Sequence, residues 1–451
     1  MGHSRKLRDI RLVVAVLLAV CAMLVPLEAA EKPPSILIIT VDALRADHLG
    51  CYGYGKNTSP NIDRLMAGGL RFERAWTPEP LTGPAMCSMV TGLYPHQHGA
   101  SRNGLRMQKG LSSLPKILAR NGYATAAIVG TWTLKDNLTL LGEHFETYGE
   151  RLSRRRWFGI LNSESTCEDV TDDALDWLEE GSGGEDAPFF LWVHYIEPHA
   201  PYRFHAEYAE QLGVNDDQLK KRDRYDSEIA VVDASIARLM AGVRKTVDES
   251  ELLVVLTSDH GESLGEHDYW GHGRYLYEPS LRIPLGIAWK GHIPSATFAA
   301  QATLLDIAPT VLSLAGVKAP DGLPGTNWAE TALDGAPVPQ RAHCYQAHRG
   351  AVHGGTHDSD RKRSKGLLSV GIVDGDRKEI LRLNPQGLEL YDLAADPGEL
   401  KNLASTQSQP SDGVLSCLAE VTSGFGTLDR LTTQKLDAET VEQLRALGYL
   451  E

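Results

Sequence analysis

The sequence predicts an α/β fold: a large, mostly parallel β-sheet flanked by helices, with a small C-terminal antiparallel sheet plus a helix. Short apolar runs rich in β-branched residues are typical of strands buried on both faces of a parallel sheet, and they lie at 35–41, 124–129, 189–195 and 252–257. Amphipathic segments between these runs are typical of helices that cover such a sheet. Alternating apolar and polar residues favour the small antiparallel sheet, at 367–373, 378–383 and 388–393.

The helices between the predicted strands have clear sequence signals. Ser59 and Pro60 are a typical cap and first residue, and Gly68 is a typical stop. A helix at 225–243 has apolar residues along one side, which indicates packing against the core. Further helices are predicted at 113–122, 170–180 and 304–316.

The composition of the 451 residues limits the classes of protein that fit. The formal net charge is −14 and no basic stripe with interleaved aromatic residues occurs, which argues against a nucleic-acid partner. Six scattered cysteines indicate neither a disulfide scaffold nor paired metal ligands. A hydrophobic content of 42% suits a large domain plus a small one. We expect the large domain at 34–330 and a smaller α+β subdomain at 342–451, with a linker rich in proline and glycine between them.

Residues 1–30 have the pattern of a signal peptide. Four basic residues precede a short apolar run at 12–25, and small residues near Ala29 and Ala30 offer a cleavage site. The run is too short for an ordinary membrane span, so we expect export to the periplasm or secretion. The alternative is a membrane anchor formed by an uncleaved N-terminal segment.

Carboxylate and imidazole side chains follow the ends of the predicted strands. Asp42 comes directly after the run 35–41, and Asp259 and His260 follow the run 252–257. Because ligands gather at the carboxyl ends of strands in open α/β sheets, these three residues are candidate metal ligands. An aspartate in this position is equally typical of a turn or a helix cap.

The stretch 76–99 predicts a short helix with a threonine before it. Pro84 suits the first helical position and Gly92 suits the end. Thr82 would therefore lie at the helix N-terminus, where free N–H groups and the helix dipole favour an anion. Its hydroxyl would be placed to meet a phosphate or sulfate ester, although an ordinary N-cap threonine has the same pattern.

One histidine follows the run 189–195 in a turn rich in proline. His199 lies between Pro198 and Pro201, which restrict the backbone close to a strand end. A lone histidine is usually structural, so this placement leaves both a substrate-facing role and a structural role open.

These motifs resemble those of the sulfatase family within the alkaline-phosphatase superfamily. In that family the nucleophile is followed by a proline, a short helix, Leu-Thr-Gly and Tyr-Pro-x-x-His-Gly. Thr91-Gly92, Tyr94-Pro95 and His98-Gly99 match this pattern. The segments with a resemblance to the family are, in chain order, 42–54, 59–69, 76–99, 130–134, 197–202, 258–262, 265–273, 276–285, 304–316, 389–403 and 444–450.

The resemblance implies an alkaline-phosphatase-like fold and a metal-dependent hydrolase of anionic esters. The metal site would consist of Asp42, Asp259, His260 and the hydroxyl oxygen of Thr82. Oxygen ligands suit Ca²⁺, Mg²⁺ or Mn²⁺, and the single imidazole also permits Zn²⁺.

The resemblance also implies catalytic roles. Thr82 would attack the ester in line and form a covalent intermediate that water then hydrolyses. His272 would contact the substrate and protonate or stabilise the leaving oxygen, and His199 would hold a substrate oxygen. A second metal held by His199, His272 and Glu197, as in two-metal phosphodiesterases of the superfamily, is a further alternative.

Several departures from the family pattern bear on the chemistry. The family's Cys or Ser, which is converted to formylglycine, is Thr82 here, and threonine cannot become formylglycine. Cys87 lies five residues too late and is interpreted as a buried helix cysteine. The remaining departures remove one metal-binding carboxylate and three groups that would face a sulfate: Ala43, Met86, Thr131 and Thr133.

Three functions therefore remain open. The first is metal-dependent hydrolysis of phosphate monoesters or diesters, or phosphoryl transfer, because this chemistry needs no formylglycine. The second is hydrolysis of sulfate esters without formylglycine. The third is a catalytically inactive binding protein on a sulfatase scaffold, against which the retained metal-ligand candidates argue. The expected partner is a small anionic ester, with a sugar or a lipid headgroup as possible alcohol moieties.

Overall fold

The computed structural model describes residues 32–156, 161–181, 187–214, 219–337, 341–350, 366–405 and 408–424. The predicted signal peptide and the sequence match at 444–450 lie outside the described residues. The chain from Pro34 onward forms one compact unit. The predicted division into domains at 34–330 and 342–451 stays a prediction.

Eight strands form the main sheet, in the order β12-β2-β11-β8-β1-β7-β3-β4. Their bounds are β1 Ser35–Val41, β2 Leu70–Trp76, β3 Ala124–Val129, β4 Thr147–Gly149, β7 Phe189–Tyr195, β8 Leu252–Ser258, β11 Arg282–Trp289 and β12 Ala296–Thr303. The four strands predicted from apolar runs lie side by side as β8-β1-β7-β3, and all of their pairings are parallel. β11 runs antiparallel to both β8 and β2. These two pairings are the exceptions in a sheet that is mostly parallel, as predicted.

The register of the central strands brings the candidate ligands to one edge of the sheet. Val41, the last residue of β1, pairs with Tyr195 of β7 and with Ser258 of β8. Asp42 directly follows β1, and Asp259 directly follows β8. They therefore leave the sheet at the same edge, although they are far apart in sequence.

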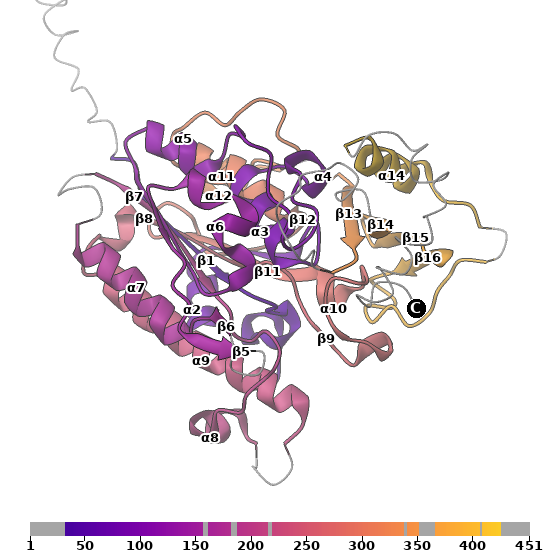
Figure 1. The fold of residues 1–451 in the computed structure, drawn as a ribbon, viewed down its shortest axis with the longest axis horizontal. Coiled ribbons are helices and arrows are strands. Elements are labelled where there is room, and N and C mark those ends of the chain that lie inside the picture. The colour runs from indigo at the N-terminus through magenta and orange to yellow at the C-terminus, as the bar shows by residue number, and fades with distance from the viewer. Residues whose placement is uncertain are drawn as a thin grey trace, which may run out of the picture. The chain divides into compact units, whose positions relative to one another are not determined.

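Helices cover both faces of the main sheet (Figure 1). Ile36 and Ile38 of β1 pack in one apolar cluster and Leu37 and Ile39 in another, because successive side chains of a strand point to opposite faces. The helices on the first face are α3 Thr82–Thr91, α5 Leu114–Arg120, α11 Ile307–Leu314 and α12 Ala329–Asp334. On the second face are α2 Pro60–Ala67, α7 Cys167–Glu179 and α9 Lys221–Val243.

α2 and α5 lie within two residues of their predicted bounds, whereas α7 begins three residues before its prediction and α11 begins three residues after its own. α9 begins four residues before the prediction, because its first turn is polar and carries no apolar periodicity. Shorter helices are α4 Pro95–His98, α6 Asp136–Thr139, α8 Ala209–Leu212 and α10 Glu278–Leu281. No helix within the described ranges has both the length and the apolar content that a membrane crossing requires.

A second, antiparallel sheet of four strands follows (Figure 1). It consists of β13 His343–His348, β14 Leu367–Asp374, β15 Arg377–Leu383 and β16 Gln386–Asp392, with α14 Asp412–Gly424 packed against it. The alternating pattern predicted the last three strands and missed β13. A disulfide between Cys344 and Cys417 joins β13 to α14, which the scattered cysteine positions did not indicate.

Buried polar contacts attach the second sheet to neighbouring parts of the fold. Lys378 of β15 is almost fully buried and its Nζ lies 2.8 Å from Glu278 Oε1 and 2.7 Å from Glu399 Oε1. His348 of β13 lies with its Nδ1 2.9 Å from Oε2 of Glu79, in the loop just before α3. The second sheet thus contacts the loop that leads to Thr82.

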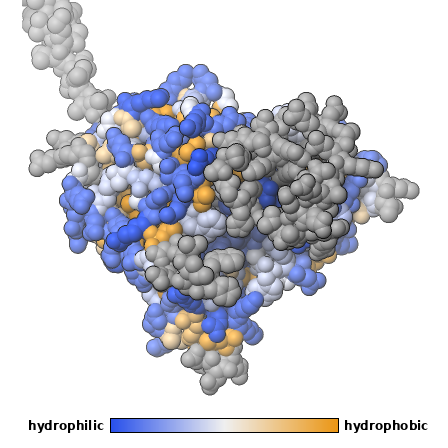
Figure 2. All heavy atoms as spheres, in the orientation of Figure 1, coloured by the Kyte–Doolittle hydropathy of each residue, from blue (hydrophilic) through white to orange (hydrophobic). Residues whose placement is uncertain are grey.

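Two small strand pairs and a mostly hydrophilic surface complete the described fold. β5 Arg154–Arg156 pairs with β6 Leu161–Glu164, and β9 Ser263–Leu264 pairs with β10 Trp270–Gly271. In Figure 2, hydrophilic residues cover most of the coloured surface and apolar residues form small separate patches.

Candidate metal centre and active site

The strand-end ligands converge in a buried position. Asp42 follows β1, and Asp259 and His260 follow β8, and all three side chains are at most 1% exposed. Nε2 of His260 lies 3.6 Å from Asp42 Oδ1 and 3.3 Å from Asp259 Oδ2. The structure therefore brings together the three ligands that the sequence pattern suggested.

A backbone hydrogen bond sets the tautomer of His260. Its Nδ1 lies 2.9 Å from the carbonyl oxygen of Gly261, and because a carbonyl only accepts, Nδ1 carries the proton. Burial lowers the pKa of His260 well below its ordinary value, so the ring is neutral. Nε2 therefore presents a lone pair toward the two carboxylates, as a metal ligand requires.

Thr82 lies inside the first turn of α3 and not before it. We expected Pro84 to open the helix, but the backbone oxygen of Leu81 already accepts from the Ala85 N–H at 3.0 Å, so the helix begins at Thr82. Proline is tolerated in the first turn because the N–H groups there have no intrahelical acceptor. Oγ1 of Thr82 lies 3.3 Å from His260 Nε2, so the hydroxyl faces the carboxylate cluster.

Two buried carboxylate oxygens make the cluster fit a cation. The Ala43 and His260 N–H groups donate to Asp259 Oδ1, at 3.0 and 2.7 Å. Within the described residues, Asp259 Oδ2 and Asp42 Oδ1 have no hydrogen-bond donor. Burial and the neighbouring Asp259 raise the pKa of Asp42 well above its ordinary value. Two buried carboxylates this close are costly to ionise together, as the raised pKa of Asp42 reflects, and a bound divalent cation would satisfy both oxygens.

His194 of β7 also faces this cluster, and the sequence analysis missed it. Its Nε2 lies 3.7 Å from Asp42 Oδ2, and the ligand atoms of Asp42, His194 and Asp259 all lie within 4.8 Å of one another. Burial lowers the pKa of His194 to about 4. A histidine near the end of an otherwise apolar run, next to the strand that carries Asp42, is the signal that could have revealed it.

His272 and His199 lie next to His260. The ring of His272 stacks on that of His260 with 4.0 Å between centroids, and the ring of His199 lies edge-on to His272 at 5.1 Å. Nδ1 of His199 donates to the Ala200 carbonyl oxygen at 2.7 Å. The structure thus brings the predicted substrate-binding histidines to the metal-ligand candidates. The second metal with Glu197 stays a prediction.

Glu262 is a further buried group that the sequence analysis missed. Its Oε1 lies 3.1 Å from His272 Nδ1. Burial alone would lower the pKa of His272, but the Glu262 carboxylate raises it above its ordinary value. Glu262 follows Asp259 and His260 in the same short segment, so the sequence already indicated that it lies near the site. Its partner His272 comes ten residues later, and the sequence did not indicate their contact.

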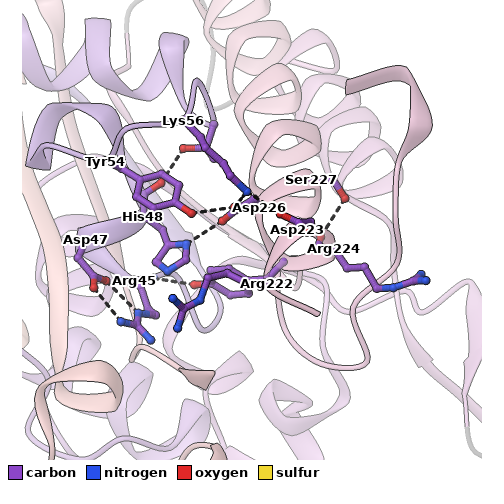
Figure 3. A network of polar contacts seen from close by, with 12 residues as sticks. Arg45, Asp47, His48, Tyr54, Lys56, Arg222, Asp223, Arg224, Asp226 and Ser227 are labelled. Atoms are coloured by element: carbon purple, nitrogen blue, oxygen red, sulfur yellow. Dashed lines mark hydrogen bonds and ion pairs between the residues drawn. The ribbon is translucent and has the colours of Figure 1, made fainter. Parts of the chain in front are cut away.

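A partly buried polar network holds the loop that follows Asp42 (Figure 3). Arg45 pairs with Asp47 at 2.7 Å and donates from Nη1 to the backbone oxygen of Glu262 at 3.0 Å. His48 pairs with Asp226 of α9 at 2.7 Å. The network therefore connects the segment after β1 both to α9 and to the segment that carries Glu262.

The residues at the positions where this sequence departs from the family pattern contribute no cationic side chain to the site. Met86 is fully buried and belongs to an apolar core cluster. The hydroxyl oxygens of Thr131 and Thr133 lie 3.1 Å from each other. Cys87 is fully buried, as predicted, and burial raises the pKa of its thiol well above the ordinary value.

A pocket of about 710 Å³ extends from His272 to the second sheet. Its lining includes three tyrosines, three arginines and one carboxylate: Tyr269, Arg274, Tyr275, Tyr277, Arg349, Arg382 and Glu389. The Glu389 carboxylate pairs with Arg382 at 2.9 Å, so two of the three arginines remain for an anionic ligand. Flat aromatic faces and guanidinium groups together suit a polar, anionic molecule with apolar ring faces.

The sequence model of the Sulfatase family matches residues 34–317. The chain belongs to the sulfatase family. A second model, described as N-sulphoglucosamine sulphohydrolase, C-terminal, matches residues 265–412. This sulfatase-family chain is thus a hydrolase that acts on ester bonds, in a metal-dependent family.

Known relatives cover nearly the whole sulfatase-family chain. Arylsulfatase A of Homo sapiens is 26% identical, over 90% of this chain and 90% of the relative. A structure solved in complex with its substrate D-glucosamine-2-N,6-O-disulfate has a TM-score of 0.69 and 21% identity, and covers 89% of this chain and 100% of that one. The phosphonate monoester hydrolase of Agrobacterium radiobacter has a TM-score of 0.66 and 20% identity, with 92% and 96% covered. These structural likenesses show that the chain shares the fold of these two solved structures.

Proposed function

We propose that this sulfatase-family protein is a metal-dependent hydrolase of phosphate monoesters or diesters, with Thr82 as its nucleophile. One observation carries the proposal: the Thr82 hydroxyl, at the N-terminus of α3, lies 3.3 Å from His260 in a buried cluster with Asp42 and Asp259. The helix N-terminus favours the anionic group of the substrate, and the hydroxyl is directed to the same position.

Asp42, Asp259, His260 and the Thr82 oxygen would hold the divalent cation. A bound cation would lower the pKa of the Thr82 hydroxyl and polarise an ester oxygen. Thr82 gives its proton to solvent, and its Oγ1 forms a bond to phosphorus as the bond to the alcohol oxygen breaks. Water then attacks the phosphorus, and Thr82 leaves and takes up a proton.

His272 is the proposed acid for the leaving alcohol. Its Nδ1 is held by Glu262 Oε1, which orients Nε2 and favours the protonated ring. The proton on Nε2 would pass to the alcohol oxygen as the ester bond breaks. His199, whose Nδ1 is held by the Ala200 carbonyl, would hold a substrate oxygen through Nε2.

The residues around Thr82 favour phosphate over sulfate. Threonine supplies an alcohol nucleophile directly, and phosphoryl transfer depends on positioning and charge stabilisation, which metal-assisted alcohol attack provides. The family's arginine, lysine and histidine contacts to sulfate are replaced by Met86, Thr131 and Thr133. Sulfate-ester hydrolysis is the second candidate, because arylsulfatase A is among the relatives.

The pocket beside His272 would hold the alcohol part of the ester. Its tyrosines could pack on a sugar ring and its arginines could bind a further anionic group, such as that of a modified sugar or a lipid headgroup. The Cys344–Cys417 disulfide supports the predicted export, because disulfides persist in oxidising compartments.

A paired hydrolysis assay tests the proposal. Aryl phosphate monoester, aryl phosphodiester and aryl sulfate are each incubated with the wild type and with the Thr82→Ala and Thr82→Ser variants, in the presence of Zn²⁺, Mn²⁺ or Ca²⁺. We expect turnover of a phosphate ester that Thr82→Ala abolishes and Thr82→Ser partly retains. Sulfate turnover that survives in Thr82→Ala would overturn the assignment of the nucleophile. No turnover of any ester, with metal binding intact, would favour a binding protein.

A further inference from the structure

We propose that His194 is an additional nitrogen ligand of the metal centre, and that its second imidazole makes the site select Zn²⁺ over Ca²⁺. The inference rests on the proposed metal site and adds a ligand to it. It concerns which ion this chain binds, and it holds whichever ester the protein hydrolyses.

The first argument is the position of His194 in the sheet. His194 of β7 pairs in register with Thr40 of β1, two residues before Asp42. Its Nε2 lies 3.7 Å from Asp42 Oδ2, and the ligand atoms of His194, Asp42 and Asp259 lie within 4.8 Å of one another. One ion can therefore be reached by all three side chains from the positions that the backbone already gives them.

The second argument is the lack of any protein partner for the three converging atoms. Among the described residues, Nε2 of His194, Oδ1 of Asp42 and Oδ2 of Asp259 are buried and make no hydrogen bond. An Nε2–H directed at Asp42 would not repair this, because 3.7 Å is too long for a hydrogen bond. A cation bound by all three atoms removes the deficit.

The third argument is the hydrogen-bond pattern on the other side of the ring. Thr40 Oγ1 accepts from Trp192 Nε1 at 2.8 Å, lies 2.8 Å from His194 Nδ1, and lies 3.4 Å from the Val193 carbonyl oxygen. A hydroxyl has two acceptor sites and one proton. All three contacts are made when Nδ1–H donates to Thr40 and Thr40 donates to Val193. Nε2 then carries a lone pair that faces the carboxylates, and metal-bound histidines commonly donate their other N–H in this way.

The identity of the ion follows from the resulting ligands. His194 forms a group with the Asp42 and Asp259 carboxylates, and Nε2 of His260 lies 3.6 and 3.3 Å from oxygens of the same two carboxylates. In the proposal both imidazoles bind the ion, and Ala43 stands where the resemblance implied a second aspartate. Ca²⁺ takes six to eight oxygen ligands, whereas Zn²⁺ accepts imidazole nitrogens and fewer ligands. One carboxylate fewer and one imidazole more therefore shift the preference to Zn²⁺.

The test measures metal binding and needs no turnover. Metal-free wild type, His194→Ala and His194→Gln are titrated with Zn²⁺ and with Ca²⁺, and their Co²⁺ forms are compared by visible absorption. We expect the wild type to prefer Zn²⁺ strongly. Loss of a direct ligand should exceed the 10–100-fold effect of an outer contact, so both variants should lose about 100-fold or more in Zn²⁺ affinity. The Co²⁺ spectrum should also change, with Ca²⁺ affinity little altered.

Two further variants keep the result interpretable. Thr40→Val removes the acceptor of Nδ1 and should weaken Zn²⁺ binding about 10-fold. His144→Gln changes another buried histidine, which contacts Ser113 and not the cluster, and should leave metal binding unchanged. Unchanged Zn²⁺ affinity and an unchanged Co²⁺ spectrum in folded His194→Ala would overturn the inference. Equal losses of Zn²⁺ and Ca²⁺ would also overturn it, since His194 would then only position Asp42. A His194-dependent Zn²⁺ site in a protein without phosphate turnover would refute the proposed function alone.

Discussion

The Glu262 carboxylate lies 3.1 Å from Nδ1 of His272, and the same His272 ring stacks on His260 at 4.0 Å. Glu262 therefore holds the ring whose other nitrogen we propose as the proton donor to the leaving group, and in that proposal Glu262 acts through His272. It is a positioning residue, and its effect should depend on how much the leaving alcohol needs a proton.

Glu262→Gln should slow the cleavage of esters with poor leaving groups more than that of activated esters. A general acid increases the rate by about 10²–10⁴-fold. A poorly held, less basic imidazole should therefore lower kcat/KM for alkyl esters by at least about 10-fold. A 4-nitrophenyl ester needs little protonation and should lose much less. The measurement is kcat/KM against the leaving-group pKa, with His272→Gln as the matched variant. Equal losses for all esters would contradict the proposed role.

Removal of the metal should destabilise the protein through the buried carboxylates. An ion that binds only the folded state at 1,000 times its Kd stabilises that state by about 4 kcal/mol. Chelation should therefore lower Tm, and added Zn²⁺ should restore it. Asp42→Asn removes one of the two facing charges, so this variant should be much less sensitive to chelator. A chelator effect of wild-type size in Asp42→Asn would argue against Asp42 as a ligand.

Reduction of the disulfide should loosen the second sheet. Cys344 and Cys417 are 73 positions apart, and a loop of this length corresponds to about 4 kcal/mol by chain entropy. We expect Cys417→Ser to lower the unfolding midpoint in urea and to abolish the effect of reductant. Cys51→Ser is the matched control, since Cys51 is a free cysteine. A reductant effect that persists in Cys417→Ser would contradict the pairing.

Protonation of His144 should contribute to acid unfolding. Burial lowers its pKa to about 4 from the ordinary 6.5, so the unfolded chain binds the proton more tightly. The stability is therefore complete above pH 6.5 and is lost as the pH falls from 6.5 toward 4, by about 2 kcal/mol once partial solvent access is considered. His144→Gln should reduce the loss of urea stability between pH 7 and pH 4.5. An acid loss identical to that of the wild type would refute this contribution.

The central strands and most helices could be predicted because burial imposes a clear period on their sequences. β2 and β12 could not, because they are partly exposed and carry charged or small residues, as in Arg71 and Glu73 of β2. β13 escaped for the opposite reason: its side chains are buried, yet histidines and a glutamine interrupt the apolar pattern.

In the site, strand-end position was sufficient to predict Asp42, Asp259 and His260. Their approach follows from strand register, which a parallel sheet makes predictable. His194 was missed because a histidine within an apolar strand cannot be distinguished from a residue that only packs in the core until the neighbouring strand is known. Glu262 was missed because its function depends on a partner from a separate loop. α3 begins two residues before Pro84 because the Ala85 N–H donates to the Leu81 carbonyl oxygen, and the preference of proline for the first helical position does not reveal this hydrogen bond.

The pairing of β1 with β8 has a consequence for how the protein acquires its ion. Ala43 and Asp259 are 216 positions apart in the chain, and they touch only when these two strands have paired. A chain in which these strands have not paired therefore cannot hold the ion between them. Cation uptake must follow this pairing, so the ion supply where the protein folds, together with the ligand set, decides which element it binds.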